Sequence, residues 1–180
     1  MANTLFHDIT ILDFTSNLAG PGCASMFADL GANVIKIERP ITGDDTRAIS
    51  PLLDGLSLQY MWLNRGKKSV VMSLKDPEAQ EMILKMAETA DIIIESYKPG
   101  QMKKYGLDYD SVRKRNEKII YCSVSAYGQE GRYSRNPGFD AMAQAMSGLV
   151  DMTGDPEGPP FKLGTTLADY IGTFNAFGAL

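Results

Sequence analysis

The stretch that decides the fold runs from Thr10 to Glu38 and reads TILDFTSNLAGPGCASMFADLGANVIKIE. Residues 10–15 form a short apolar run typical of a buried strand, and residues 33–38 form a second one. Between them, apolar residues recur at the spacing of one helical face (Cys23, Met26, Phe27 and Leu30), which predicts a helix over residues 21–30. A strand, a helix and a strand in this order predict a right-handed βαβ unit.

The same alternation continues along the rest of the chain. Further strands are predicted over residues 69–74, 92–95 and 119–125. Helices are predicted over residues 77–89, 109–116 and 137–149, and from residue 166 onward. Strands that alternate with helices predict an α/β fold, with a Rossmann-like parallel sheet flanked by helices.

The length of 180 residues suffices for one domain with a substantial core, so we expect a single domain over residues 1–180. The chain ends inside the apolar run 171–180, with no glycine cap, no basic last turn and no proline beyond it. On this pattern we expect residues 1–180 to be the N-terminal portion of a longer polypeptide.

The composition narrows the class of protein. The chain is 44% hydrophobic and 22% charged, with a formal net charge of −4. It has no apolar run of about 20 residues and no basic segment followed by an apolar one at its N-terminus, so we predict a cytoplasmic protein with no membrane partner. Cys23 and Cys122 are the two cysteines and His7 is the one histidine, which disfavours a disulfide framework, a metal site and histidine-based catalysis.

Positive charge gathers in one segment. Residues 98–118 hold seven basic and three acidic side chains, a net +4 that leaves −8 for the rest of the chain. Such a run is usually a solvated helix face, but on an acidic protein it also marks a place where an anionic ligand docks. Nucleic acid is disfavoured as the ligand, because the segment is short and the whole protein is acidic.

Asp169 is the first candidate for chemistry. It follows a stretch of small residues and precedes the apolar run 171–180. A carboxylate in this position either caps the helix that follows or acts chemically at its N-terminus, and on the local pattern alone capping is the more common role.

The first strand–helix turn offers a second candidate. Gly20-Pro21-Gly22, with Glu38 at the end of the next strand, resembles a dinucleotide-binding fingerprint. The match is poor, because Ser25 stands where a third glycine is needed and Pro21 stiffens the loop. A nicotinamide-dependent oxidoreductase is therefore a weak alternative.

A set of motifs in fixed order is more specific. The first three are LAGP (18–21), ADLGANVIKIERP (28–40) and GDDTR (43–47). They are followed by NRGKKS (64–69), LKDPE (74–78), ESYKPG (95–100), KYGL (104–107), SAYGQEG (125–131), PGFD (137–140), QAMSG (144–148) and LAD (167–169). These motifs resemble those of the family III CoA-transferases, the CaiB/BaiF family, and the resemblance covers essentially all 180 residues.

The resemblance implies the N-terminal part of a fold in which two full-length chains form an interlocked homodimer. It also implies an enzyme that moves CoA from an acyl-CoA donor to a carboxylic acid acceptor. Coenzyme A is then substrate and carrier, with no tightly bound cofactor. The catalytic aspartate of the family falls on Asp169. It would attack the donor to give an aspartyl anhydride, then an aspartyl-CoA thioester and a second anhydride.

The CoA contacts of the family fall on Arg39, Met72, Lys75, Ser96, Tyr97 and Lys104. The basic side chains among them suit phosphates, and Tyr97 offers an aromatic face to adenine. Each also has a plainer interpretation: Met72 as core filling, and Lys75 and Lys104 as solvated surface. Asp140 is equally well explained as a helix cap or as a second acid near the site.

Two departures from the family pattern bear on function. The family commonly has Asn-Phe at the positions of Ser96-Tyr97, and often arginine in place of Lys104. Racemases of the family have histidine in the motif that here reads Gly138-Phe139-Asp140. Phe139 cannot move a proton, which disfavours an acyl-CoA racemase. The remaining alternative is a CoA-binding fragment without turnover.

Overall fold

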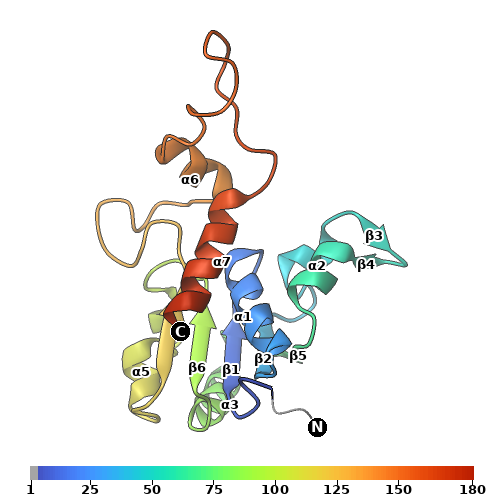
Figure 1. The fold of residues 1–180 in the computed structure, drawn as a ribbon. Coiled ribbons are helices and arrows are strands. Elements are labelled where there is room, and N and C mark those ends of the chain that lie inside the picture. The colour runs from blue at the N-terminus through green and yellow to red at the C-terminus, as the bar shows by residue number, and fades with distance from the viewer. Residues whose placement is uncertain (1–3) are drawn as a thin grey trace.

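The computed structural model describes residues 4–180 and has a central parallel sheet (Figure 1). Its five strands are β1 (Thr10–Phe14), β2 (Asn33–Glu38), β5 (Lys68–Val71), β6 (Ile92–Glu95) and β7 (Ile120–Ser123). Their spatial order is β5-β2-β1-β6-β7, and all neighbours pair in parallel. The predicted α/β fold class is confirmed.

Helices cover both faces of this sheet. On one face lie α1 (Ala19–Asp29) and α7 (Leu167–Ala179), and on the other lie α3 (Pro77–Ala87), α4 (Gln101–Lys104) and α5 (Tyr109–Arg113). The strands supply both cores by alternation, because successive side chains of a strand point to opposite faces. Ile11, Ile92 and Ile94 pack toward α1, whereas Leu12 and Ile93 pack toward α3.

The chain moves outward in both directions from β1, since β2 lies on one side of it and β6 on the other. The carboxyl ends of β1 and β6 therefore flank a topological switch point, where open α/β sheets usually bind ligands. This places the candidate site at the edge of the sheet formed by the carboxyl ends of the strands.

Helix α7 lies against α1 although about 150 residues separate them in sequence (Figure 1). Small residues allow the close contact: a Cβ added at Gly22 would lie 2.9 Å from Oγ1 of Thr173, and one added at Gly172 would lie 3.5 Å from Cβ of Ala19. Thr173 Oγ1 also donates a hydrogen bond to the carbonyl of Ala19 over 2.9 Å. This contact fixes the second turn of α7 beside the first turn of α1.

The predicted helices and strands are all present; β2 and β6 have the predicted bounds, α1 begins two residues earlier than predicted, and most other elements end earlier. Helix α6 spans Asp140–Met146 within the predicted range 137–149, and β5 begins at Lys68 and ends at Val71 rather than at residue 74. Gly20-Pro21-Gly22 lies inside the first turn of α1, not in a loop before it. Proline is well tolerated there because its missing N–H would have no helical partner.

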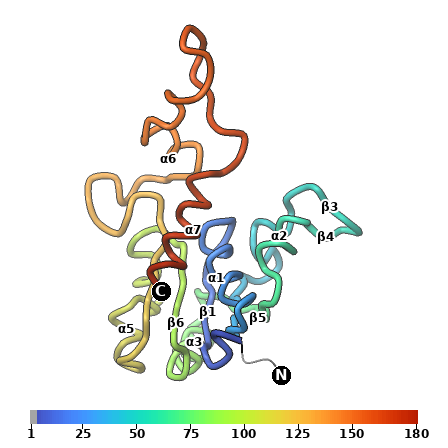
Figure 2. The backbone as a smooth tube through the Cα atoms, in the orientation of Figure 1, coloured from blue at the N-terminus to red at the C-terminus, as the bar shows by residue number. Residues whose placement is uncertain are grey.

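Two segments project away from the sheet (Figure 2). One contains the 3-10 helix η1 (Asp45–Ala48), the hairpin of β3 (Leu52–Leu53) and β4 (Leu56–Ser57), and α2 (Leu58–Leu63). The other is the loop between α6 and α7. Among residues 4–180 no helix is long and apolar enough to cross a membrane.

Candidate active site

A cavity of about 350 Å³, here called the first cavity, opens at the carboxyl ends of β1, β6 and β7. The first turns of α1, α6 and α7 form its other walls. Its lining carries two carboxylates, Asp140 and Asp169, and several neutral polar groups (Ser16, Asn17, Ser96, Ser125 and Asn175). The first cavity therefore joins the predicted catalytic residue to the switch point of the sheet.

Asp169 is the third residue of α7, and Thr166 occupies the N-cap position. The capping interpretation of Asp169 is therefore wrong: Asp169 lies in the first turn itself, half-buried at the wall of the first cavity. No hydrogen bond from the described residues reaches its carboxylate; burial, and secondarily the charge of Asp140, raise its pKa. A carboxylate placed in this way is free to react with a ligand in the cavity.

Asp140 combines the two roles that its sequence allowed. It begins α6, yet its Oδ1 accepts a hydrogen bond from the backbone N–H of Ala168 in α7 over 2.9 Å. Its Oδ2 accepts one from Nε2 of the fully buried Gln144 over 2.7 Å. Asp140 therefore caps α7 from a neighbouring helix and is a second acid in the first cavity.

Gln144 also accepts a hydrogen bond from the backbone N–H of Leu163 through Oε1, over 2.9 Å. It thereby connects α6 to the end of the loop that leads into α7. No pattern in the sequence indicated this role, because Leu163 lies 19 residues from Gln144, in the loop before α7.

Arg39 and Tyr97 meet at a smaller cavity of about 50 Å³, the second cavity, between the carboxyl ends of β1, β2 and β6. Ser96 lines the first cavity, and its Oγ accepts a hydrogen bond from the backbone N–H of Ser16 over 3.1 Å. Ser16 lines both cavities. A continuous strip therefore leads from Asp169 past Ser96 to Tyr97 and Arg39.

Arg39 and Tyr97, at the far end of this strip, differ in their exposure to solvent. Nε of Arg39 donates to Thr42 Oγ1 over 2.8 Å, and its guanidinium pairs with Asp45, but the side chain stays half-exposed. The Tyr97 ring is half-buried edge-on against Tyr105, with ring centroids 6.5 Å apart. Burial raises the pKa of Tyr97, and the Arg39 guanidinium counteracts that rise. An exposed cation thus stands beside a half-buried aromatic ring.

Met72, Lys75 and Lys104 lie outside both cavities. Met72 follows β5, donates its backbone N–H to the carbonyl of Glu38 over 2.9 Å and packs against the core, which favours the core-filling interpretation. Lys75 and Lys104 are exposed, and neither forms an ion pair within the described part of the chain. The structure therefore gathers three of the six predicted CoA contacts along one strip.

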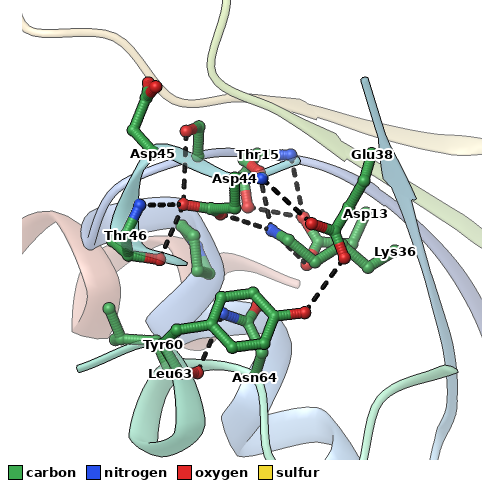
Figure 3. A network of polar contacts seen from close by, with 12 residues as sticks. Asp13, Thr15, Lys36, Glu38, Asp44, Asp45, Thr46, Tyr60, Leu63 and Asn64 are labelled. Atoms are coloured by element: carbon green, nitrogen blue, oxygen red, sulfur yellow. Dashed lines mark hydrogen bonds and ion pairs between the residues drawn. The ribbon is translucent and has the colours of Figure 1, made fainter. Parts of the chain in front are cut away.

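Two strands carry buried charges that the sequence analysis missed (Figure 3). Asp13 in β1 and Lys36 in β2 are 0% and 1% exposed, in the middle of otherwise apolar runs. Lys67 pairs with Asp13 over 2.8 Å, and Lys36 pairs with Asp44 over 2.8 Å. A charge inside a parallel strand has to be paired, because both faces of such a sheet are covered. This rule could have predicted from the sequence that Asp13 and Lys36 have buried partners of opposite charge.

Glu38 forms a second buried centre at the end of β2 and is 3% exposed. Its carboxylate accepts hydrogen bonds from the guanidinium of Arg47, the hydroxyls of Tyr60 and Ser69 and the backbone N–H of Asp44. Glu38 thereby fastens the whole projecting segment between β2 and β5 to the sheet. Donors of the protein itself occupy both of its carboxylate oxygens, whereas the acid of a dinucleotide fingerprint accepts hydrogen bonds from a ribose.

No group of three or more His, Cys, Asp and Glu side chains among residues 4–180 is arranged to hold a metal ion. Cys23 and Cys122 are both free thiols.

Comparison with known proteins assigns the chain to a family. Residues 6–180 match the model of CoA-transferase family III. The chain is 45% identical over 168 residues to the succinate–glutarate CoA-transferase of Agrobacterium fabrum, covering 89% of this chain and 42% of that protein. It is 42% identical over 173 residues to the succinyl-CoA:glutarate CoA-transferase of Homo sapiens, covering 96% of this chain and 40% of that protein.

A solved structure agrees with these sequence relatives. The crystal structure of a CaiB/BaiF family protein from Brucella suis superposes with a TM-score of 0.93 at 36% identity, over 98% of this chain and 48% of that one. The chain thus spans less than half the length of these relatives. Because the family model covers almost the whole chain, the predicted resemblance is confirmed, and the chain belongs to CoA-transferase family III.

Proposed function

We propose that this chain carries the nucleophile and part of the CoA site of an enzyme that moves CoA from an acyl-CoA to a carboxylic acid. The observation that carries the proposal is the Asp169 carboxylate, free of hydrogen bonds from the described residues, on a cavity whose lining continues to Tyr97 and Arg39. Relatives at 42–45% identity are named as CoA-transferases, which supports the same class of reaction.

The proposed reaction has four acyl transfers. Asp169 attacks the carbonyl carbon of the donor thioester, the C–S bond breaks, and CoA leaves as a thiolate. The thiolate attacks the aspartyl carbonyl of the resulting anhydride and expels the donor acid as a carboxylate. The acceptor carboxylate attacks the aspartyl-CoA thioester and releases the thiolate again. The thiolate finally attacks the acceptor acyl carbon and frees Asp169.

These steps balance without water, a proton or a further reagent, since each bond formed replaces one broken. The first turn of α7 suits them: the positive end of the helix stabilises the carboxylate that leaves in the last step. Burial removes water from the Asp169 carboxylate and raises its pKa, and a poorly solvated carboxylate is the stronger nucleophile toward a thioester.

The proposal is tested by CoA exchange. The full-length protein is incubated with one acyl-CoA and a panel of free carboxylic acids, and the products are separated by liquid chromatography with mass detection. Appearance of a new acyl-CoA, with release of the donor acid in equal amount, is the expected result. Free CoA without a new thioester would contradict the proposal, because it would indicate hydrolysis.

The CoA contacts that the family resemblance implies give a direct binding prediction. Lys104→Ala is expected to weaken CoA by about 1–2 kcal/mol through loss of one charge-assisted contact to phosphate. Tyr97→Ala is expected to weaken CoA as well, through loss of a face for adenine. Isothermal titration with CoA measures both changes, and Lys103→Ala, an exposed neighbour on α4, is the matched control. Wild-type affinity in both variants would remove this assignment.

The second acid gives a pH prediction. Because the charge of Asp140 contributes to the raised pKa of Asp169, Asp140→Asn is expected to lower that pKa. CoA transfer requires the ionised Asp169 carboxylate. The acidic limb of the pH profile of kcat should therefore move to lower pH in Asp140→Asn. The pH profile of kcat measures the shift, with the exposed Asp151→Asn as control. An unchanged acidic limb would show that Asp140 does not set the charge state of Asp169.

A CoA-binding module without turnover is the second candidate function. The observation in its favour is that the chain spans about two fifths of the length of the named transferases. CoA binding in titration together with no exchange in the assay above is the outcome that this alternative predicts. An acyl-CoA racemase stays disfavoured, because Phe139 at the wall of the first cavity has no group that exchanges a proton.

We further propose that the full-length protein is a homodimer and acts in the cytoplasm. The first statement rests on the family resemblance and the second on composition.

A further inference from the structure

We propose that Lys36 is a positioning residue for CoA: its ammonium group ties the turn after β1 to the loop after β2, the two walls of the second cavity. This inference rests on the proposed function, because the ligand that the walls would receive is CoA.

The contacts of Lys36 run to both walls. Its Nζ donates to the backbone carbonyl of Thr15 over 2.8 Å and lies 2.8 Å from Oδ2 of Asp44. Thr15, Lys36 and Asp44 all line the second cavity. The side chain is 1% exposed, so water does not compete for these contacts.

Each wall is then fixed further by its own contacts. On one side, Thr15 is followed by Ser16, whose backbone N–H donates a hydrogen bond to Oγ of Ser96. Ser96 is the residue next to Tyr97. On the other side, Asp44 donates its backbone N–H to Glu38 over 2.9 Å, while its Oδ1 accepts from the N–H and hydroxyl of Thr46. Asp44 therefore closes the loop that begins with Arg39. Lys36 links these two sets of contacts through its two 2.8 Å contacts, and a longer hydrogen bond of 3.5 Å from Ser16 Oγ to Asp44 Oδ1 runs beside it.

Charge balance alone requires Lys36 only as the counter-ion of Asp44. Lys67 already lies 2.8 Å from Asp13, whereas Lys36 is 3.9 Å from it. Oδ2 of Asp44 has no hydrogen bond of favourable direction, and the Lys36 ammonium is its compensation among the described residues.

Removing both charges of a buried ion pair often leaves the stability of the fold unchanged, because burying two charges costs about as much free energy as their attraction contributes. The stability of the fold therefore does not explain why a lysine occupies position 36. A requirement to hold the two walls of the second cavity at a fixed separation does explain it.

Two variants separate positioning from folding. Lys36→Met leaves Asp44 uncompensated and is expected to lower both stability and CoA affinity. The double variant Lys36→Met/Asp44→Asn removes both charges. It should recover most of the stability while its CoA dissociation constant stays at least fivefold above wild type. Lys67→Met is the matched control, because it removes a buried ammonium of the same network that does not link the two walls.

The measurements are isothermal titration with CoA and urea unfolding of the full-length protein, with kcat at saturating CoA as a third readout. We expect kcat in the double variant within about twofold of wild type. A double variant with wild-type CoA affinity would overturn the proposal, and so would an equal loss of affinity in Lys67→Met. Failure of both Lys36 variants to fold, with Lys67→Met folded, would also overturn it, since Lys36 would then serve the fold. If the wild type does not bind CoA, the proposed function fails with it.

Discussion

Replacing Asp169 with Asn is expected to abolish CoA transfer, with a fall in kcat of at least about a thousandfold, as when a covalent nucleophile is removed. The amide cannot attack a thioester carbonyl, although it has nearly the same shape as the carboxylate. The fold should persist, because Asp169 is half-buried and its carboxylate holds no hydrogen bond from residues 4–180. The assay is CoA exchange in the full-length protein.

The controls separate chemistry from binding. CoA affinity of Asp169→Asn, measured by titration, should stay within about twofold of wild type, since Tyr97 and Arg39 are untouched. The exposed Asp151→Asn should retain full exchange. Near-normal turnover by Asp169→Asn would end the covalent mechanism.

Glu38→Gln is expected to lower the free energy of unfolding by about 2 kcal/mol, the loss of a charge-assisted hydrogen bond to a buried carboxylate whose partner Arg47 is 41% exposed. The substituted amide keeps the shape but leaves the Arg47 guanidinium without its anion. It also brings an N–H group toward the donors of Tyr60 and Ser69. The projecting segment between β2 and β5 should therefore loosen first. Urea unfolding measures the change, with the exposed Glu130→Gln as control.

The effect of Glu38→Gln should depend on pH. Burial alone would raise the pKa of Glu38, but hydrogen bonds from Arg47, Ser69, Asp44 and Tyr60 outweigh it and hold the pKa well below its usual range. A carboxylate with a lowered folded pKa stabilises the fold above its unfolded pKa of about 4.3 and loses that contribution as pH falls toward the folded value. The difference between wild type and Glu38→Gln should therefore be largest near pH 7 and shrink below about pH 4. A difference that grows toward low pH would contradict this account.

The parallel sheet was predictable because its strands are short, apolar and separated by helical periodicity. In β1 and β6 the aliphatic residues are buried in the two cores, so the apolar pattern and the buried pattern coincide except at Asp13 and Glu95, which are polar and buried. Helix ends were less predictable. Helix α6 is shorter than its apolar pattern, since Asp140 begins it and the chain then leaves for the loop before α7.

The segment between β2 and β5 could not be predicted from periodicity. Its elements are two to six residues long and depend on distant partners, above all on Glu38. Two local signals were available: Ser57 accepts the backbone N–H of Tyr60 at the start of α2, and Asp54-Gly55, with φ values of 50° and 79°, forms the two-residue turn of the β3–β4 hairpin.

The candidate site was predictable in part. Asp169, Ser96, Tyr97 and Arg39 follow helix starts and strand ends, and the topology of a parallel sheet brings such positions to one edge. The half-burial of Asp169 beside Asp140 could not be read from sequence, because the two residues come from different helices that meet through Ala168. The tie between Lys36 and Asp44 likewise joins a strand to a loop.

Trapping of the aspartyl intermediate tests the central claim most directly. The full-length protein is mixed with a donor acyl-CoA, quenched with hydroxylamine and digested, and the peptide that contains Asp169 is analysed by mass spectrometry. An anhydride or thioester on Asp169 would be converted to a hydroxamate, so the account predicts that modification at Asp169 in wild type and its absence in Asp169→Asn. Exchange of CoA in the same sample with Asp169 unmodified, or a hydroxamate on another carboxylate such as Asp140, would contradict it.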